Sequence, residues 1–107
     1  MKTDSVYVKK AQIFQALSHP VRLHILDALR SDEACVCHLQ ELIVKPQAYI
    51  SQQLRILKDA GIVKGRRDGM QVYYSINSAI VFDVLALVLG KTKPKVILSD
   101  CRCSKCN

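Results

Sequence analysis

Apolar residues in the first third of the chain recur at helical spacing. Residues 5–17 and residues 21–29 each carry an apolar stripe with the ~3.6-residue period of an amphipathic helix. Pro20 suits the first turn of the second helix, where its missing backbone donor would be unpaired anyway. Ser31 and Asp32 have the short polar side chains that cap helices, and we expect them to begin a third helix.

Residues 33–57 contain this third helix and a fourth, separated by a polar connector at residues 44–47. Pro46 lacks a backbone donor and restrains the residue before it, so one helix cannot continue through the connector. The fourth helix is expected to end near Gly61, in a left-handed conformation. Its two faces differ: the apolar face consists of Ile50, Leu54 and Leu57, and the polar face carries Gln47, Tyr49, Gln52 and Arg55. Two short helices with a polar second helix are typical of a helix-turn-helix that reads DNA.

The period changes from helical to alternating in residues 62–76. β-rich runs flank the sequence Arg66-Arg67-Asp68-Gly69, and Asp-Gly is a strong signal for a β-hairpin. A hairpin with Arg66 and Arg67 near its tip, placed directly after a recognition helix, indicates the wing of a winged helix, with both guanidinium groups near phosphates or the minor groove. The simpler interpretation is a solvated turn that is merely basic.

The last helical pattern, residues 79–89, is apolar nearly all round and begins after Asn77 or Ser78. Such a helix must be buried on most sides, which a chain this small cannot do alone. We therefore expect a mainly α fold with a β-hairpin wing, a winged helix-turn-helix that forms a homodimer through its first and last helices. The same run is too short to cross a bilayer and contains Asp83, so no membrane association is expected.

The net charge and the lack of an apolar signal segment at the N-terminus limit the class of partner and the expected location of the protein. The 107 residues contain 16 Lys and Arg against 9 Asp and Glu, a formal net charge of +7, and nucleic acid is a common partner of such a domain. A basic but otherwise inert protein is the alternative. The N-terminus has no apolar core for a signal peptide, so we expect a cytoplasmic protein whose thiols stay reduced.

Five cysteines occur in two clusters. Cys35 and Cys37 form a C-x-C pair at the start of the third helix, and Cys101, Cys103 and Cys106 form C-x-C-x-x-C near the C-terminus. In reducing surroundings these are better explained as metal ligands or redox sensors than as a disulfide framework. The alternative is that Cys35 and Cys37 are small buried apolar residues. We divide the chain into a DNA-binding and dimerisation domain, residues 1–90, and a flexible Cys-rich tail, residues 91–107.

Helix geometry limits how the first pair can act. Residues i and i+2 of a regular helix point in different directions, so Cys35 and Cys37 share one ion only if Cys35 precedes the regular turns or if binding unwinds the helix start. The segment from Gly90 to Cys101 spans about 33 Å when extended, so the tail can complete this site on either subunit or form its own. His38 is expected at the surface rather than as a ligand, and His19 and His24 in structural roles. No nucleophile–base pair or phosphate-binding loop indicates an enzyme.

The chain resembles the arsenic-repressor (ArsR/SmtB) family of metal-responsive winged-helix repressors. Four stretches carry the likeness: LSHPVRLHIL at 17–26, EACVCHLQEL at 33–42, QAYISQQLRILKDAGIV at 47–63 and GRRDGMQVYYSI at 65–76. The resemblance implies a dimer that represses an operon until an inducer binds. It also gives Cys35 and Cys37 the role of inducer ligands.

Departures from the family pattern limit which residues can bind the inducer and the DNA. Arsenic sensors of one subgroup have a third cysteine where this chain has Gln40, and cadmium and lead sensors of another use an N-terminal extension that here contains no cysteine. Both facts leave the cysteines of the tail as the candidates for further ligands. Some members bind zinc through histidine and acidic residues of the last helix. In this chain that helix contains Asp83 but no histidine, so we expect no such zinc site. On the DNA side, Gln47, Ser51 and Gln52 align with the family's contacts, and Gln53 replaces a frequent histidine.

The sequence thus predicts a repressor that binds double-stranded operator DNA as a dimer and leaves it when a thiophilic inducer (arsenite, cadmium, lead or zinc) binds the cysteines. A redox or persulfide sensor on the same scaffold is the first alternative. A metal-sequestering protein whose charge is incidental is the second.

Overall fold

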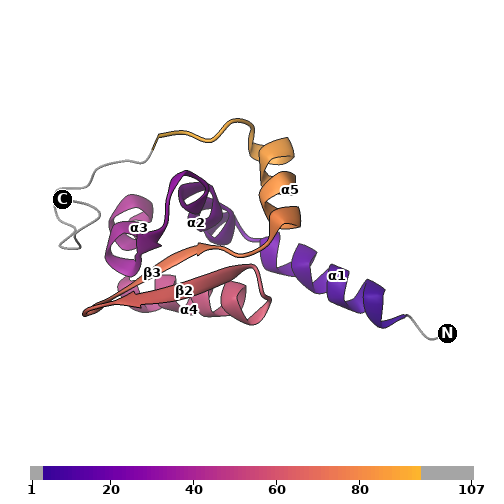
Figure 1. Ribbon diagram of the computed structural model, residues 1–107, viewed down its shortest axis with the longest axis horizontal. Helices are drawn as coiled ribbons and strands as arrows, with labels where there is room; N and C mark the ends of the chain where they lie inside the picture. Colours follow the sequence, from indigo (N-terminus) through magenta and orange to yellow (C-terminus); the bar gives the residue numbers. More distant parts are fainter. Residues whose placement is uncertain (1–3, 95–107) are drawn as a thin grey trace.

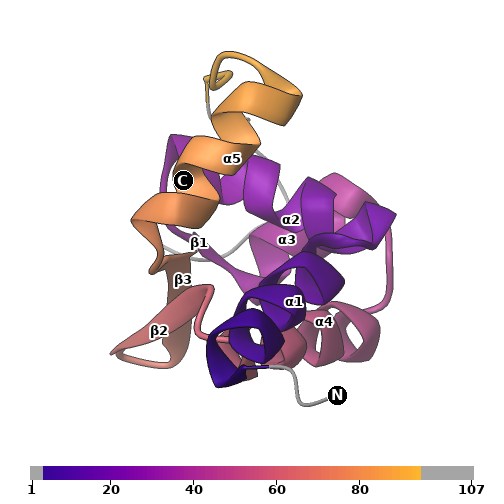
Figure 2. The same cartoon turned by 90° about the vertical axis from the view of Figure 1, so that its right-hand side faces the viewer.

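Five helices and three strands succeed one another in residues 4–94, the part of the chain that this computed structural model describes. The helices are α1 (Ser5–Leu17), α2 (Pro20–Ser31), α3 (Val36–Ile43), α4 (Gln47–Asp59) and α5 (Ala79–Leu89), and the strands are β1 (Ala34–Cys35), β2 (Val63–Asp68) and β3 (Gln71–Ile76). Helix α1 extends away from the other elements at one end (Figure 1). Seen from that end, the hairpin lies on one flank of the helices and α5 rises above it (Figure 2).

Local hydrogen bonds determine where the first two helices begin. The Asp4 carboxylate accepts the N–H of Val6 at 3.1 Å, and Nδ1 of His19 accepts the N–H of Val21 at 3.2 Å. Pro20 occupies the first turn of α2 as predicted, and His19 is the cap before it. Helix α2 continues to Ser31, two residues beyond the predicted 21–29.

The prediction that Ser31 and Asp32 begin the third helix is wrong. The Ser31 hydroxyl donates to the carbonyl of Ala28 at 2.8 Å and so belongs to the end of α2, while Asp32 has extended backbone just after it. Helix α3 begins only at Val36, with Cys35 in the capping position. The capping residues therefore lie before an element that the sequence pattern did not reveal.

That element is strand β1, which pairs with the middle of β3, the second strand of the hairpin. Its register places Ala34 opposite Tyr74 and Cys35 opposite Tyr73, giving an antiparallel sheet of order β1-β3-β2. A two-residue strand has no periodicity of its own to detect. Only its partner strand, almost forty positions later in the sequence, makes it a strand.

The two helices of the helix-turn-helix form as predicted. Helix α3 ends at Ile43 and is capped by Val44, which has a left-handed backbone (φ 59°), and α4 begins after Pro46. The predicted apolar face of α4 is fully inside, where Ile50, Leu54 and Leu57 join the core. Gly61 follows α4 with φ 76°, the left-handed conformation that the sequence indicated.

The predicted hairpin is also present, with its turn between Asp68 and Gln71 and Gly69 at φ 61°. Strand β2 extends through Asp68, so Arg66 and Arg67 belong to the strand rather than to the turn itself. Together the helix-turn-helix and the hairpin form the winged helix-turn-helix that was expected.

Helix α5 is covered on one side only. Val81 and Leu85 are buried against the core, whereas Ile80, Leu87 and Val88 are exposed. Helix α1 likewise exposes Val6, Tyr7, Val8 and Phe14. Large apolar side chains are thus exposed on the two helices assigned to the dimer interface. No helix among the described residues is long and apolar enough to cross a membrane.

Candidate nucleic-acid interface and thiol pair

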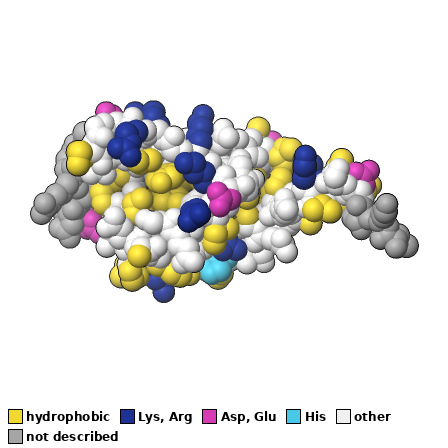
Figure 3. Space-filling view, turned by 90° about the horizontal axis from the view of Figure 1, so that it is seen from below, with side chains coloured by type: hydrophobic (Ala, Val, Ile, Leu, Met, Phe, Trp, Pro, Cys, Tyr) yellow, Lys and Arg dark blue, Asp and Glu magenta, His cyan; other side chains and the backbone are white. Residues whose placement is uncertain are grey.

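The outer face of α4 presents most of the side chains that the sequence assigned to DNA. Gln47, Ser51, Gln52 and Arg55 are exposed on this helix. Tyr49 is half-buried instead, and its hydroxyl lies 3.5 Å from Nε2 of His19, the cap of α2. Viewed from the side of α4 and the hairpin, Lys and Arg side chains are spread over the surface (Figure 3). This face therefore combines hydrogen-bonding groups with positive charge.

Gln53 does not belong to that face. It is only 5 % exposed, and its side-chain oxygen accepts a hydrogen bond of 3.0 Å from Arg22. Arg22 also donates to the carbonyls of Ala16 and Gln15, at 2.6 and 3.2 Å. One guanidinium group thus joins the end of α1 to the inner side of α4. The residue that replaces the family's frequent histidine at position 53 acts in the protein interior.

The role of Arg22 was not predicted from the sequence, although Gln53 offered a signal. Gln53 stands three positions after Ile50 and beside Leu54, on the buried stripe of α4. A polar residue on a buried stripe needs a hydrogen-bond partner. Which residue supplies it depends on how α1 and α2 pack, which no local pattern reveals.

The two arginines of β2 differ in their surroundings. Arg67 is exposed near the turn, whereas Arg66 donates two hydrogen bonds to the carboxylate of Glu33, at 2.6 and 3.3 Å. The Arg66 guanidinium also lies 5.1 Å above the centre of the Tyr73 ring and 3.7 Å from Asp68. The hydrogen bond that Arg66 donates to Glu33, aided by nearby negative charge, raises the pKa of Arg66 above its already high value. Arg66 remains charged, with its direction set by Glu33.

Cys35 and Cys37 meet at the junction of β1 and α3. Cys35 is fully buried with extended backbone (φ −86°, ψ 167°), and Cys37 is half-buried in the first turn of the helix. Because Cys35 precedes the regular turns, the two Sγ atoms lie 2.8 Å apart, although residues i and i+2 within a helix would diverge. This is the first of the two arrangements that allow the pair to share one ligand.

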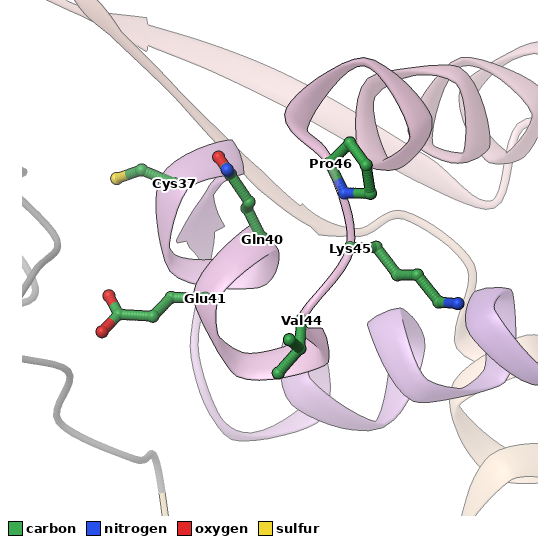
Figure 4. Close-up of a pocket in the computed structure, with 6 residues that line it drawn as sticks. All are labelled: Cys37, Gln40, Glu41, Val44, Lys45 and Pro46. Carbon is green, nitrogen blue, oxygen red and sulfur yellow. The ribbon is translucent and has the colours of Figure 1, made fainter.

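A cavity of about 530 Å³ adjoins the pair on the side of Cys37. It is lined by Cys37, Gln40, Glu41, Val44, Lys45 and Pro46. Cys37 and Glu41 lie one turn apart on α3 and point to the same side of the helix (Figure 4). An ion therefore has access to the pair at Cys37, while Cys35 is enclosed by protein.

The prediction for His38 is wrong. This side chain is 2 % exposed and lies in the interior, because α3 turns it toward α2, where it borders a second cavity with His24 and Asp27. Within residues 4–94, no group of three or more His, Cys, Asp or Glu side chains is placed to hold a metal ion. The tail residues Cys101, Cys103 and Cys106 lie outside the described residues. The described part of the chain thus offers two soft sulfur ligands to a thiophilic ion, which suits such ions but does not complete a coordination shell.

Comparisons with known proteins agree with this architecture. Residues 19–64 match the model of the "Bacterial regulatory protein, arsR family". An uncharacterized HTH-type transcriptional regulator of Methanocaldococcus jannaschii is 43% identical over 83 residues, covering 77% of this chain and 93% of that protein. The cadmium resistance transcriptional regulatory protein CadC homolog of Staphylococcus aureus is 41% identical over 68 residues, covering 63% of this chain and 60% of that protein.

A solved structure extends the likeness to the fold. It is the homodimeric winged helix-turn-helix DNA-binding domain of a possible ArsR-family transcriptional regulator from Mycobacterium bovis. The two chains superpose with a TM-score of 0.75 at 31% identity, covering 82% of this chain and 84% of that one.

Proposed function

The chain belongs to the ArsR family of bacterial regulatory proteins, and from this premise we propose that it is a repressor that leaves its operator when a thiophilic ion binds Cys35 and Cys37. The family makes it a transcriptional regulator that binds DNA rather than an enzyme. The observation that carries the proposal is the meeting of the two thiols, 2.8 Å apart, at the start of α3, the first helix of the helix-turn-helix.

The separation of the two sulfur atoms supplies a physical reason for a switch. Two thiolates bound to one ion at metal–sulfur distances of ~2.3 Å and tetrahedral angles are held about 3.8 Å apart. The observed 2.8 Å is shorter. We propose that binding takes up this difference partly by shifting Cys37 in α3 relative to Cys35 in β1, beyond what rotation of the two side chains supplies. Helix α3 is joined to α4 by only the short connector at residues 44–46, so this displacement is expected to reach the recognition helix.

The inducer is proposed to be arsenite, cadmium or lead, with zinc as the less sulfur-selective candidate. The relative from Staphylococcus aureus is a cadmium resistance regulator, which favours an ion of this kind. We place the protein in the cytoplasm, where the thiols stay reduced and able to bind.

The remaining ligands are proposed to come from Cys101, Cys103 or Cys106 of the same subunit. Arg30 donates to the carbonyl of Gly90 at 2.7 Å, and the segment after it runs back over α2, so that Lys93 and Pro94 border a cavity with His38 and Leu42 of α3. From Pro94, an extended chain reaches about 23 Å by Cys101. The chain thus heads toward the helix that carries Cys37.

DNA and partner contacts follow from the exposed faces. Gln47, Ser51 and Gln52 are proposed to read bases from α4, with Tyr49, Arg55, Arg66 and Arg67 contacting the DNA around them. The apolar faces of α1 and α5 are proposed to pair two copies of the chain, as the neighbour from Mycobacterium bovis is homodimeric. Two recognition helices then face two half-sites.

Fluorescence anisotropy of the operator region with fully reduced protein tests the proposal. Adding Cd(II), Pb(II), As(III) and Zn(II) in turn is expected to weaken DNA binding about 5- to 150-fold for at least one ion, the usual range of allosteric coupling. The same titration on a chain in which all three tail cysteines are replaced by serine is expected to need more ion. DNA affinity indifferent to every ion would contradict the proposed function, and an unaltered ion requirement in the tail variant would contradict the tail's part in it.

A redox or persulfide sensor is the second candidate, and the short distance between the two sulfur atoms favours it. Oxidation by a peroxide or a disulfide would remove two electrons and two protons from Cys35 and Cys37 and join their sulfurs. DNA release by such an oxidant, together with indifference to every ion under strict reduction, would establish this candidate instead. Metal sequestration alone is not supported, because the relatives are transcriptional regulators.

The wing should contribute chiefly non-specific affinity through Arg67. Replacing Arg67 by alanine is expected to weaken binding to all duplex sequences alike and to reduce the slope of log K against log salt by about one per wing, the value for one lost phosphate contact. Met70→Ala, in the same turn region but without charge, should leave the slope unaltered. A sequence-selective loss in Arg67→Ala would show that Arg67 reads bases instead.

A further inference from the structure

Three residues form one row across the sheet, and the row begins at the thiol pair. Cys35 of β1 stands opposite Tyr73 of β3, and Tyr73 stands opposite Arg66 of β2. Directly opposed residues direct their side chains to the same face of a sheet. Cys35 and Tyr73 are buried, and the Arg66 guanidinium covers the Tyr73 ring at 5.1 Å. The buried end of the row is therefore Cys35, a proposed ligand of the inducer ion, and the exposed end is Arg66 of the wing.

Glu33, which lies just before β1, contacts the Arg66 end of this row. It precedes Cys35 by two residues, a spacing that puts two side chains of an extended segment on the same face. Its carboxylate accepts both hydrogen bonds from Arg66, and its side chain is only 18 % exposed, against 52 % for Arg66. A bidentate pair that is partly shielded from water fixes the direction of a guanidinium group better than an open surface pair does. The position of Arg66 thus depends on two residues that move with β1 or β3.

We propose that Glu33 is a positioning residue that couples the thiol pair to the wing, an inference that rests on the proposed ion-dependent release. When an ion pulls Cys35 and Cys37 into a new spacing, β1 shifts, and Glu33 and Tyr73 carry Arg66 with it. The wing then no longer holds its guanidinium group where the DNA backbone passes. This route is separate from the one through α3 and α4, because it runs through the sheet.

The test compares DNA affinity with and without Cd(II) in four proteins: the wild type, Glu33→Gln, Arg66→Lys and Asp68→Asn. Glutamine keeps the shape of Glu33 but removes the charge, and lysine keeps the charge of Arg66 but loses the planar fork needed for two hydrogen bonds. Asp68→Asn is the matched control, since Asp68 also lies near Arg66 but on the turn side of β2. Cd(II) binding itself is followed by sulfur-to-metal absorption in the ultraviolet.

The readout is the ratio of the DNA Kd with Cd(II) to the DNA Kd without it. Glu33→Gln and Arg66→Lys are each expected to reduce this ratio at least about fivefold while Cd(II) affinity stays within about twofold, and Asp68→Asn should keep the wild-type ratio. A mere loss of structure would lower both DNA affinities together and leave the ratio unaltered. A wild-type ratio in Glu33→Gln, or weakened Cd(II) binding in it, overturns the inference. A wild-type protein that no ion releases would instead overturn the proposed function.

Discussion

Replacing Cys37 by serine is expected to remove ion-dependent release from DNA altogether. Cys37 supplies one of the two thiols that the described residues place at the junction of β1 and α3, and it borders the cavity through which we propose that an ion reaches them. Loss of a residue that merely supports a metal ligand already costs 10- to 100-fold in metal affinity, so loss of the ligand itself should cost more than about 100-fold. Cys37 is half-buried, which lets the serine hydroxyl reach water.

Anisotropy with and without Cd(II) measures this result, and the ratio of the two DNA dissociation constants should fall to about one. Gln40→Ser provides the matched control, because it places serine in the wall of the same cavity and removes no thiol. Thermal melting verifies that both variants fold. Cys35→Ser is the less clear test, since its hydroxyl would be fully buried in the sheet and would need a hydrogen-bond partner there. Release of Cys37→Ser by the wild-type concentration of ion would refute the thiol mechanism.

Leu87→Glu is expected to separate the proposed dimer into monomers. Leu87 is 86 % exposed on α5, amid the other uncovered apolar residues of that helix, and we propose that the second copy of the chain covers it. A buried leucine contributes about 1.5–3 kcal/mol, and a two-fold interface contains it twice. The dimer should therefore weaken by at least ~3 kcal/mol, more than about 100-fold in its dissociation constant, before the cost of burying a charge is added.

Sedimentation velocity at micromolar concentration measures this change, and DNA binding to paired half-sites should fall with it. Thr92→Glu introduces the same charge at an exposed position just beyond α5 and should leave the dimer intact. A Leu87→Glu protein that remains dimeric would place the interface elsewhere. A wild-type protein that is monomeric at the same concentration would contradict the proposed dimer and, with it, the binding of two half-sites.

The helix pair and the wing were predictable because their signals are local. The spacing of Ile50, Leu54 and Leu57 determines which face of α4 enters the core, and the Asp68–Gly69 pair forms its turn wherever two β-rich runs flank it. The proximity of Cys35 and Cys37 was predictable only as a condition, since it required Cys35 to precede the helix. The structure meets that condition by placing Cys35 in β1.

Contacts between distant segments were not predictable. Ser31 and Asp32 have the right side chains for a helix start, but the residues that follow them pair with Tyr73 and Tyr74 and so form a strand. His38 has no local feature that buries it. The bonds from Arg22 to Gln53 and from Arg66 to Glu33 join residues more than thirty positions apart.

By itself, the sequence determined the order of the five helices and the hairpin, the buried face of α4, and the presence of two soft thiols beside a basic helix-turn-helix. These properties depend on residue type and on spacing within one turn or one hairpin. Tertiary structure alone decided that Cys35, Tyr73 and Arg66 share one row of the sheet and that Glu33 holds the end of it. Register between strands far apart in the sequence is set by the packing of the whole core, so no local pattern contains it.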